Sequence, residues 1–282
     1  MEKKFIFKNN AFDLIRYWAA ITVMLGHFAW KVIPYAQGNI VLQEIGKVST
    51  FFPGVVILFS MSGFLISASY ERSKDKKEFF MKRVLRMYPE LWVCTIVNLA
   101  VVCLLAYQLL DKSIWVWLGT QIFGIAYTPS CLKEFATGSV NGALWTIFTE
   151  LQLYIVLGIV YRWIKKFNIK KWILLLGFLV ICNLLADFVD GSLGGVVGKI
   201  IERFFLTYAL WFFIGVFCYV QKDRLVPLLK NWIILLFLLC VICKCLPIAI
   251  PGYYTNIATG ILLPLIVIGG GTAYHQFAYR VI

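Results

Sequence analysis

The sequence has few charged residues and carries none of the local motifs of common soluble enzymes. Asp, Glu, Lys and Arg make up only 15% of the 282 residues. There is no G-x-S-x-G, Walker, H-E-x-x-H or G-x-G-x-x-G motif. Hydrophobic residues form 61% of the chain, against roughly 45–50% in soluble domains. This excess excludes a soluble globular fold, and it also excludes disorder, collagen and coiled coil.

Long apolar runs dominate the chain instead. A helix needs about 20 mostly apolar residues to cross the bilayer core. Eight runs meet this requirement, at residues 11–31, 51–70, 90–110, 142–164, 172–189, 199–220, 231–250 and 257–276. The apolar segment 113–127 is too short to span, so we expect an outer-face helix or a re-entrant segment there. No internal repeat is visible, so the sequence predicts one all-α, polytopic membrane domain over residues 1–282.

The distribution of basic residues predicts the orientation of these helices. Lys and Arg outnumber Asp and Glu by 27 to 14, and most of them lie in the segments 1–10, 71–89, 162–171 and 221–230. Loops rich in Lys and Arg stay in the cytoplasm, so these four segments are predicted to be cytoplasmic, together with the N-terminus. The chain is therefore expected to be a multi-pass protein of the plasma membrane, in contact with membrane lipids.

The eight cysteines fall mostly inside the predicted spans, where a free thiol behaves as a small hydrophobe. Cys240, Cys243 and Cys245 are close in sequence, but no histidine or carboxylate lies near them and their spacing matches no zinc module well. We expect neither a metal site nor a nucleic-acid partner.

Ionisable residues inside the spans are the candidates for a working site, because a charge at the bilayer centre costs at least about 2.5–3.5 kcal/mol. The first run contains Asp13, Arg16 and His27. Helical geometry places Arg16 and His27 on one face, about 16 Å apart. Glu150 lies about 12 Å deep in the run 142–164, where it could meet His27 if the two helices are neighbours. An alternative is that all three residues of the first run are interfacial groups.

A carboxylate beside an imidazole suits a general base or an acyl-carrying histidine. A second constellation lies in the basic segment 71–89, where Arg83 and Arg86 are three residues apart and precede Tyr88 and Pro89. Guanidinium groups bind phosphate oxygens in fixed geometry, so this pair suits a phosphorylated carrier such as coenzyme A. Topology and contact with anionic lipids explain the same basic residues equally well.

Four stretches together resemble the acyltransferase family 3 membrane proteins, which are bacterial enzymes that O-acylate cell-surface glycans. The stretches are Phe12-Asp13-Leu-Ile-Arg16 through Gly26-His27-Phe28, Phe51-Phe-Pro-Gly54-Val55 through Ser62-Gly63-Phe64-Leu65-Ile66, Phe80-Met-Lys-Arg83-Val-Leu-Arg86-Met-Tyr88-Pro89, and Trp145-Thr146 through Glu150 to Tyr154. They follow the family's order and lie in the first 165 residues of the chain.

The resemblance implies a role for each candidate. His27 would be the catalytic residue and Arg16 its partner on the same helix. Arg83 and Arg86 would serve the acyl-CoA donor, and Glu150 matches the acidic residue of the family's Trp/Glu/Tyr motif. Family members usually run longer and carry a Ser-Tyr…Tyr…His stretch near the end, so we expect this chain to lack the family's last one or two helices.

The function expected from the resemblance is transfer of an acyl group, most commonly acetyl, from cytoplasmic acyl-CoA to a hydroxyl of a cell-surface polysaccharide or glycolipid. Acyl-CoA would be a co-substrate, with no tightly bound cofactor. Direct transfer and an acyl-histidine intermediate need the same residues, so both stay open, and neither the acyl group nor the acceptor is specified. A transporter or flippase that uses His27, Arg16 and Glu150 as a relay is the alternative, and a non-catalytic scaffold is a third possibility.

Overall fold

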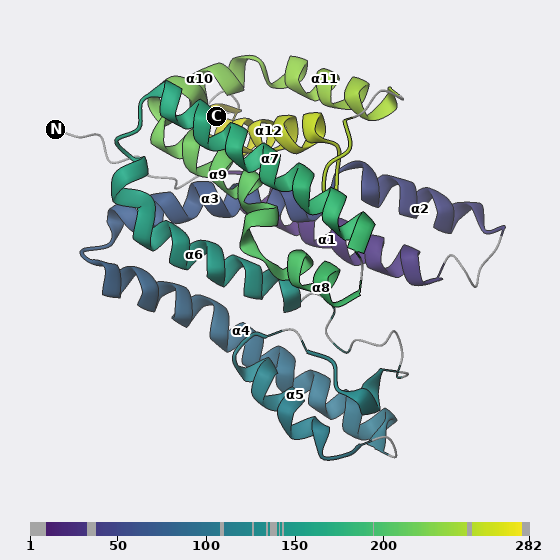
Figure 1. The fold of residues 1–282 in the computed structure, drawn as a ribbon. Coiled ribbons are helices and arrows are strands. Elements are labelled where there is room, and N and C mark those ends of the chain that lie inside the picture. The colour runs from purple at the N-terminus through teal and green to yellow at the C-terminus, as the bar shows by residue number, and fades with distance from the viewer. Residues whose placement is uncertain are drawn as a thin grey trace. The chain divides into compact units, whose positions relative to one another are not determined.

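Helices make up the protein, and no strand occurs in the part of the chain that the structure describes (Figure 1). The computed structural model describes residues 10–32, 38–107, 110–125, 127–133, 135, 140, 142, 144–193, 195–246 and 250–277. Its elements are α1 (Phe12–Val32), α2 (Ile40–Phe51), α3 (Gly54–Arg72), α4 (Lys76–Leu105), α5 (Ser113–Ile122), the short 3-10 turn η2 (Ser130–Leu132), α6 (Leu144–Ile164), α7 (Ile169–Leu193), α8 (Gly195–Arg203), α9 (Phe205–Val220), α10 (Lys222–Asn231), α11 (Ile233–Cys245) and α12 (Ile257–Phe277).

Each of the eight predicted apolar runs overlaps a helix, and the run 199–220 covers the end of α8 and the whole of α9. Among the described residues, five helical stretches are long and apolar enough to cross a membrane, or six if the pair α10 and α11, bent by 72°, counts as one span. The five stretches are Ile40–Arg72, Lys76–Leu105, Leu144–Ile164, Ile169–Ser192 and Ile200–Val220. The first helix, which carries Asp13 and Arg16, is not among them, and the apolar part of the last helix is limited to Ile257–Thr272. A multi-pass helical membrane protein is thus supported. The count of eight spans and the cytoplasmic N-terminus stay predictions, and residues 1–9 lie outside the described residues.

The chain packs as two compact units, and each is described here by itself. Unit 1 comprises Met1–Ala68, Arg162–Glu202 and Leu206–Ile282, and unit 2 comprises Ser69–Tyr161 with Arg203–Phe205. These units are defined by packing alone, so the single functional domain expected from the sequence stays a prediction.

Unit 1 is held together at its centre by a close crossing of α3 and α9. A side chain at Gly63 would collide with the backbone oxygen of Phe212, and one at Gly215 would collide with the backbone oxygen of Ser60. The two glycines therefore allow the two backbones to approach each other directly. Small residues at such crossings stabilise membrane helix pairs, because dispersion contacts replace the hydrophobic effect between helices.

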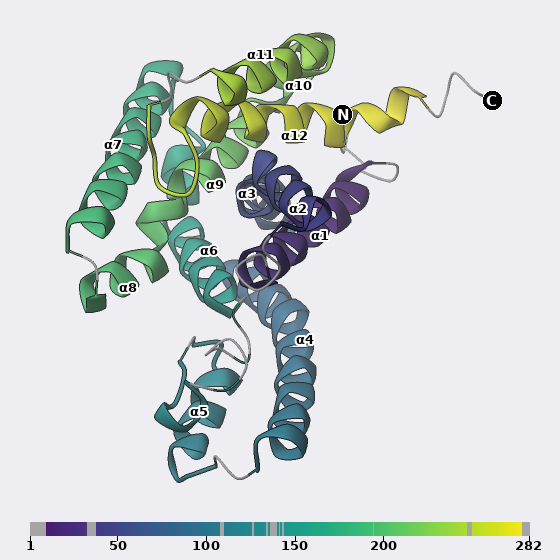
Figure 2. The same cartoon turned by 90° about the vertical axis from the view of Figure 1, so that its right-hand side faces the viewer.

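The direction of the helices in unit 1 follows from contacts at their ends. The backbone N–H of Ala11 donates to the oxygen of Gly271 at 3.0 Å, and the Phe12 ring packs where a side chain at Gly271 would lie. The beginning of α1 thus meets the last part of α12, so the two helices run antiparallel (Figure 1). Helices α10 and α11 lie beside α12 (Figure 2). The C-terminal half of α1 consequently points to the end of unit 1 at which α12 begins.

Unit 2 is built on an antiparallel pair of helices, α4 and α6. The Phe80 ring packs against Gly158, and farther along α4 the Leu91 side chain lies near Gly124, as do Ile147 and Leu151 of α6. As residue numbers rise along α4, those of its neighbours on α6 fall, which fixes the antiparallel register.

The segment 113–127 confirms the expectation of a helix too short to span. It contains α5, which has ten residues and packs beside α4. A small apolar core seals the contact through Val102, Ile114, Trp117 and Leu132. This helix is therefore an appendage of the α4 span in unit 2.

Candidate functional site

The first group of candidates lies on α1, in unit 1. Because α1 is one unbroken helix from Phe12 to Val32, the predicted shared face of Arg16 and His27 is confirmed. The Nη1 atom of Arg16 lies 2.8 Å from Oδ1 of Asp13, and the Asp13 side chain is 74% exposed. The His27 side chain is also exposed, and it makes no hydrogen bond to any residue that the structure describes.

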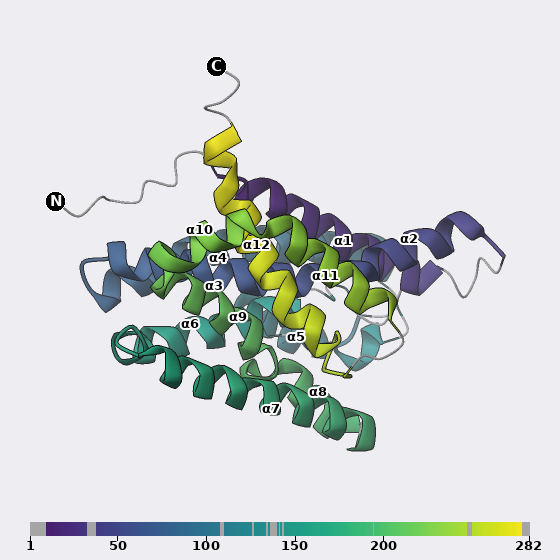
Figure 3. The ribbon, with the colours of Figure 1, turned by 90° about the horizontal axis from the view of Figure 1, so that it is seen from above.

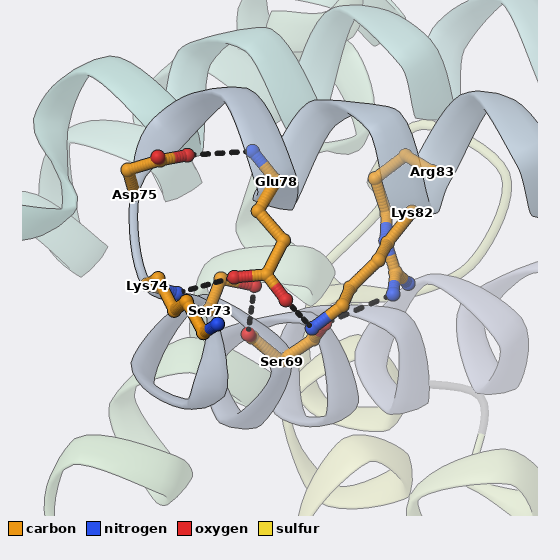
Figure 4. Close-up of polar contacts among 7 residues, drawn as sticks. All are labelled: Ser69, Ser73, Lys74, Asp75, Glu78, Lys82 and Arg83. Carbon is orange, nitrogen blue, oxygen red and sulfur yellow. Dashed lines mark hydrogen bonds and ion pairs between the residues drawn. The ribbon is translucent and has the colours of Figure 1, made fainter.

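The second group is carried by the start of α4, which the sequence caps firmly (Figure 4). The Asp75 carboxylate accepts a hydrogen bond from the backbone N–H of Glu78 at 2.7 Å. The Glu78 carboxylate accepts one from the backbone N–H of Lys74 at 2.6 Å and pairs with Lys82 Nζ at 2.8 Å. This reciprocal arrangement resembles a capping box, which satisfies backbone donors that a helix start leaves unpaired. The first turns of α4 are therefore a well-defined base for the arginines that follow.

Arg83 is anchored on this base by a contact with α3. Its Nη2 atom donates to Oγ of Ser69 at 2.9 Å (Figure 4). Its Nε atom is buried and has no hydrogen-bond partner within the described parts of the chain. Arg86 follows one turn later on the same helix and is exposed. Arg83 and Arg86 thus share one helix, as predicted, with the Arg83 guanidinium bonded to Ser69 and Arg86 exposed.

Glu150 belongs to unit 2 as well and acts on the same arginine. The Tyr154 hydroxyl donates a hydrogen bond to Oε1 of Glu150, one helical turn away on α6. The antiparallel register of α4 and α6 brings Tyr154 level with Arg83, and Arg83 interacts electrostatically with both Tyr154 and Glu150. A carboxylate, a phenol and a guanidinium thus form one polar cluster between two helices of unit 2.

The sequence linked Glu150 to His27, marked Tyr154 only as the end of a motif stretch, and gave Ser69 no role. His27 belongs to unit 1 and Glu150 to unit 2, so their meeting stays a prediction. The spacing of four residues between Glu150 and Tyr154 is a signal for a pair on one helix face. Ser69 lies fourteen residues before Arg83 on another helix, so no local pattern could have indicated it.

The apolar helices and the polar residues that they carry define a multi-pass helical membrane protein. A family model described as an acyltransferase domain matches residues 9–280. The chain belongs to this family, acyltransferase family 3, in agreement with the resemblance of its four motifs. No solved structure matches the chain.

Two curated proteins are similar to parts of the chain. Nodulation protein 10 of Rhizobium leguminosarum bv. viciae is 34% identical over 164 residues, which cover 53% of this chain and 43% of that protein. An O-acetyl transferase of Shigella phage Sf6 is 28% identical over 191 residues, which cover 64% of this chain and 54% of that protein. The chain thus spans about half the length of the curated relatives it matches.

Proposed function

We propose that this protein is an integral-membrane O-acyltransferase. It transfers an acyl group, most commonly acetyl, from cytoplasmic acyl-CoA to a hydroxyl of a cell-surface polysaccharide or glycolipid. Membership of the acyltransferase family and the similarity to a phage O-acetyl transferase support this proposal. The observation that carries it is the exposed imidazole of His27, which has no hydrogen bond to any described residue and lies on the same helix face as Arg16.

The donor site is proposed at the start of α4. Arg86 is exposed and Arg83 keeps a buried N–H without a described partner, so the two guanidinium groups are suited to bind the phosphate oxygens of coenzyme A. Ser69 holds Arg83 in place at 2.9 Å. Glu150 and Tyr154 provide an opposing polar face that limits how far the Arg83 guanidinium turns.

The chemistry is proposed at His27. In direct transfer, an imidazole nitrogen takes the proton of the acceptor hydroxyl while the hydroxyl oxygen attacks the thioester carbonyl. The carbon–sulfur bond breaks, and the departing thiolate of coenzyme A takes the proton back from the imidazolium. In the stepwise route, the imidazole attacks the thioester carbonyl and the thiolate of coenzyme A departs. The acceptor hydroxyl then attacks the acyl-imidazole, the acyl–nitrogen bond breaks, and the hydroxyl proton passes to the thiolate. Glu150 is proposed to stabilise the imidazolium in either route, which requires the two units to bring these residues together.

The proposed function is tested by transfer of radiolabel from acetyl-CoA to glycan. Membranes that contain the protein should incorporate label into the glycan fraction, and membranes that contain an empty vector should not. Mild alkali should release the label, because O-esters are cleaved under these conditions. Movement of glycolipid across the membrane without any covalent labelling would instead support the transporter reading and overturn the proposal.

Loss of the Arg83 guanidinium is expected to weaken donor binding. Hydrogen bonds to charged groups contribute about 1.5–3 kcal/mol, so Arg83→Ala should raise the KM for acetyl-CoA by about tenfold or more. A titration of acetyl-CoA in the same membranes measures this change. Lys77→Ala is the matched control, because Lys77 is an exposed basic residue of the same helix start. Equal effects of both substitutions on the KM for acetyl-CoA would mean that the donor is bound by the positive charge of the helix start and not by a defined contact with a phosphate group.

A further inference from the structure

An aromatic cluster lies at the end of unit 1 where α7 finishes and α12 begins. The rings of Tyr208 and Trp211, both on α9, have centroids 5.7 Å apart. Tyr253 meets Tyr208 edge-on at 5.9 Å, and Tyr254 meets Trp211 at 6.2 Å. Two consecutive tyrosines of the segment before α12 are thus seated on two aromatic residues of α9.

Buried hydrogen bonds fix this segment to α7 and α9. The Asn183 side chain is buried on α7, where its Nδ2 donates to the backbone oxygen of Thr207 at 3.0 Å. Its Oδ1 accepts from the backbone N–H of Tyr253 at 3.1 Å. The Tyr208 hydroxyl donates to the backbone oxygen of Glu202 at 2.9 Å. The cluster is therefore a rigid construction that connects three helices, which is the property that a binding site requires.

Part of this cluster is left open to a ligand. The Tyr254 side chain is 50% exposed although its neighbour Trp211 is buried. The hydroxyl of Thr255, the next residue in the chain, is buried and has no hydrogen-bond partner among the residues that the structure describes, and the same holds for Thr259 in the first turn of α12. Unpaired buried hydroxyls cost stability, so two of them within five residues of the Tyr254 ring indicate groups kept available for a partner.

Three carboxylates act on one ring of the same cluster, that of Tyr253. Asp187 and Asp190 near the end of α7, and Glu202 on α8, act electrostatically on the Tyr253 hydroxyl. Burial, and next the Asp190 charge, raise the pKa of Tyr253 to about 12, so its hydroxyl stays protonated at neutral pH. Figure 3 shows α8 folding back from the end of α7. No group of three His, Cys, Asp or Glu side chains in the described chain is placed to hold a metal ion.

We propose that this cluster is the acceptor subsite and that it binds an uncharged sugar ring. The apolar C–H face of a pyranose packs on an exposed aromatic ring such as Tyr254, and its hydroxyls donate to carboxylates and bond to the Thr hydroxyls. The charges of Asp187, Asp190 and Glu202 repel phosphorylated and uronic-acid sugars. This inference rests on the proposed acyltransferase function and gives its acceptor a chemical class.

The place of the cluster in unit 1 fits this role. Because α1 and α12 run antiparallel, the C-terminal half of α1, which carries His27, points to the end of unit 1 at which α12 begins (Figure 1). The Lys-rich turn before α7, predicted to be cytoplasmic, lies at the other end of α7. An acceptor bound at Tyr254 is therefore at the end of unit 1 to which the His27 half of α1 points.

The test measures sugar binding apart from chemistry. The full chain, purified in detergent, is applied to an array of neutral oligosaccharides and of matched uronic-acid and phosphorylated oligosaccharides. We expect retention on neutral glycans only. Tyr254→Ala should reduce this retention at least tenfold, and Tyr254→Phe should preserve it. Trp232→Ala removes another exposed aromatic of unit 1 and should leave retention unchanged.

A further variant separates loss of the ring from a change in the backbone. Tyr254 has a φ of 69°, a left-handed conformation that glycine adopts without cost. Tyr254→Gly should lose retention as fully as Tyr254→Ala does, whereas retention by the glycine variant would trace the effect to the backbone and overturn the proposal. Retention on no neutral glycan, or equal retention on the anionic ones, would also overturn it.

The outcome is distinguishable from failure of the proposed function. His27→Ala should keep full retention on the array while losing acyl transfer. In transfer assays, Tyr254→Ala should raise the acceptor KM about tenfold and leave the acetyl-CoA KM unchanged. Sugar retention without any acetyl transfer would leave the subsite standing and refute the enzyme, and transfer that ignores Tyr254→Ala would refute the subsite and leave the enzyme.

Discussion

His27→Ala is expected to abolish acyl transfer, with a loss of at least a hundredfold. A positioned general base contributes about 10²–10⁴-fold to a rate, and removal of an acyl-carrying nucleophile costs at least as much. The His27 side chain is exposed and has no hydrogen bond to a residue that the structure describes, so the truncation creates no cavity and leaves no partner unpaired. Incorporation of acetyl label into membrane glycan, divided by the amount of inserted protein, measures the effect.

The matched control for this substitution is Met24→Ala. Met24 lies on the same helix, almost one turn before His27, and is 62% exposed. Truncation there removes a similar volume from the α1 surface without removing a titratable group, so transfer should change less than twofold. Full activity of His27→Ala in a well-inserted protein would remove His27 from the mechanism. A parallel loss in both variants would show that the α1 surface matters through packing.

Much of the fold could be predicted from the sequence because the bilayer makes composition decisive. In hydrocarbon a backbone must satisfy its own hydrogen bonds, so every long apolar run becomes a helix. The limits of α4 were harder to predict. The run 90–110 gave the apolar part, but the helix begins at Lys76, because Lys, Glu, Met and Arg are good helix formers and Asp75 caps them. An apolar run predicts which residues lie inside the membrane, but it does not predict the residue at which the helix begins.

The helix α2 was not predicted. It lies mostly between the predicted apolar runs 11–31 and 51–70, where Gln43, Glu44 and Lys47 interrupt the apolar character of the sequence. The structure has a helix at Ile40–Phe51, capped by the Asn39 side chain and packed beside α1. A search for amphipathic periodicity after a capping residue, and not for apolar length, would have indicated it.

The site was predictable within single helices and not between them. Helical geometry alone placed Arg16 with His27 and Arg83 with Arg86, since these pairs share a helix. The contact of Arg83 with Ser69 depends on how α3 and α4 pack, which no local pattern specifies. The sequence-based pairing of His27 with Glu150 concerns two helices of different units and stays a prediction for functional tests of both residues.

A leucine at Gly215 is expected to prevent the protein from folding stably. A side chain there meets the backbone oxygen of Ser60 on α3, and the neighbouring backbone nitrogen of Phe64 lies 2.9 Å from the same point. A backbone cannot rotate away as a flexible side chain can, so α3 and α9 must separate. Overpacking of a core costs about 1–3 kcal/mol, occasionally more, and here the contacts of the whole crossing are lost as well. Thermal unfolding in detergent should show a melting temperature lower by several degrees or a failure to insert.

The chain supplies a matched control for this prediction in Gly177→Leu. Gly177 lies inside α7, is exposed, and would meet nothing within 4 Å if it carried a side chain. Both substitutions replace a helical glycine by leucine, so they share the gain in helix propensity, and only Gly215→Leu forces two backbones apart. Gly177→Leu should therefore keep or raise the melting temperature. Equal stability of the two variants would mean that α3 and α9 do not cross closely in the membrane. That result would contradict the packing described for the centre of unit 1.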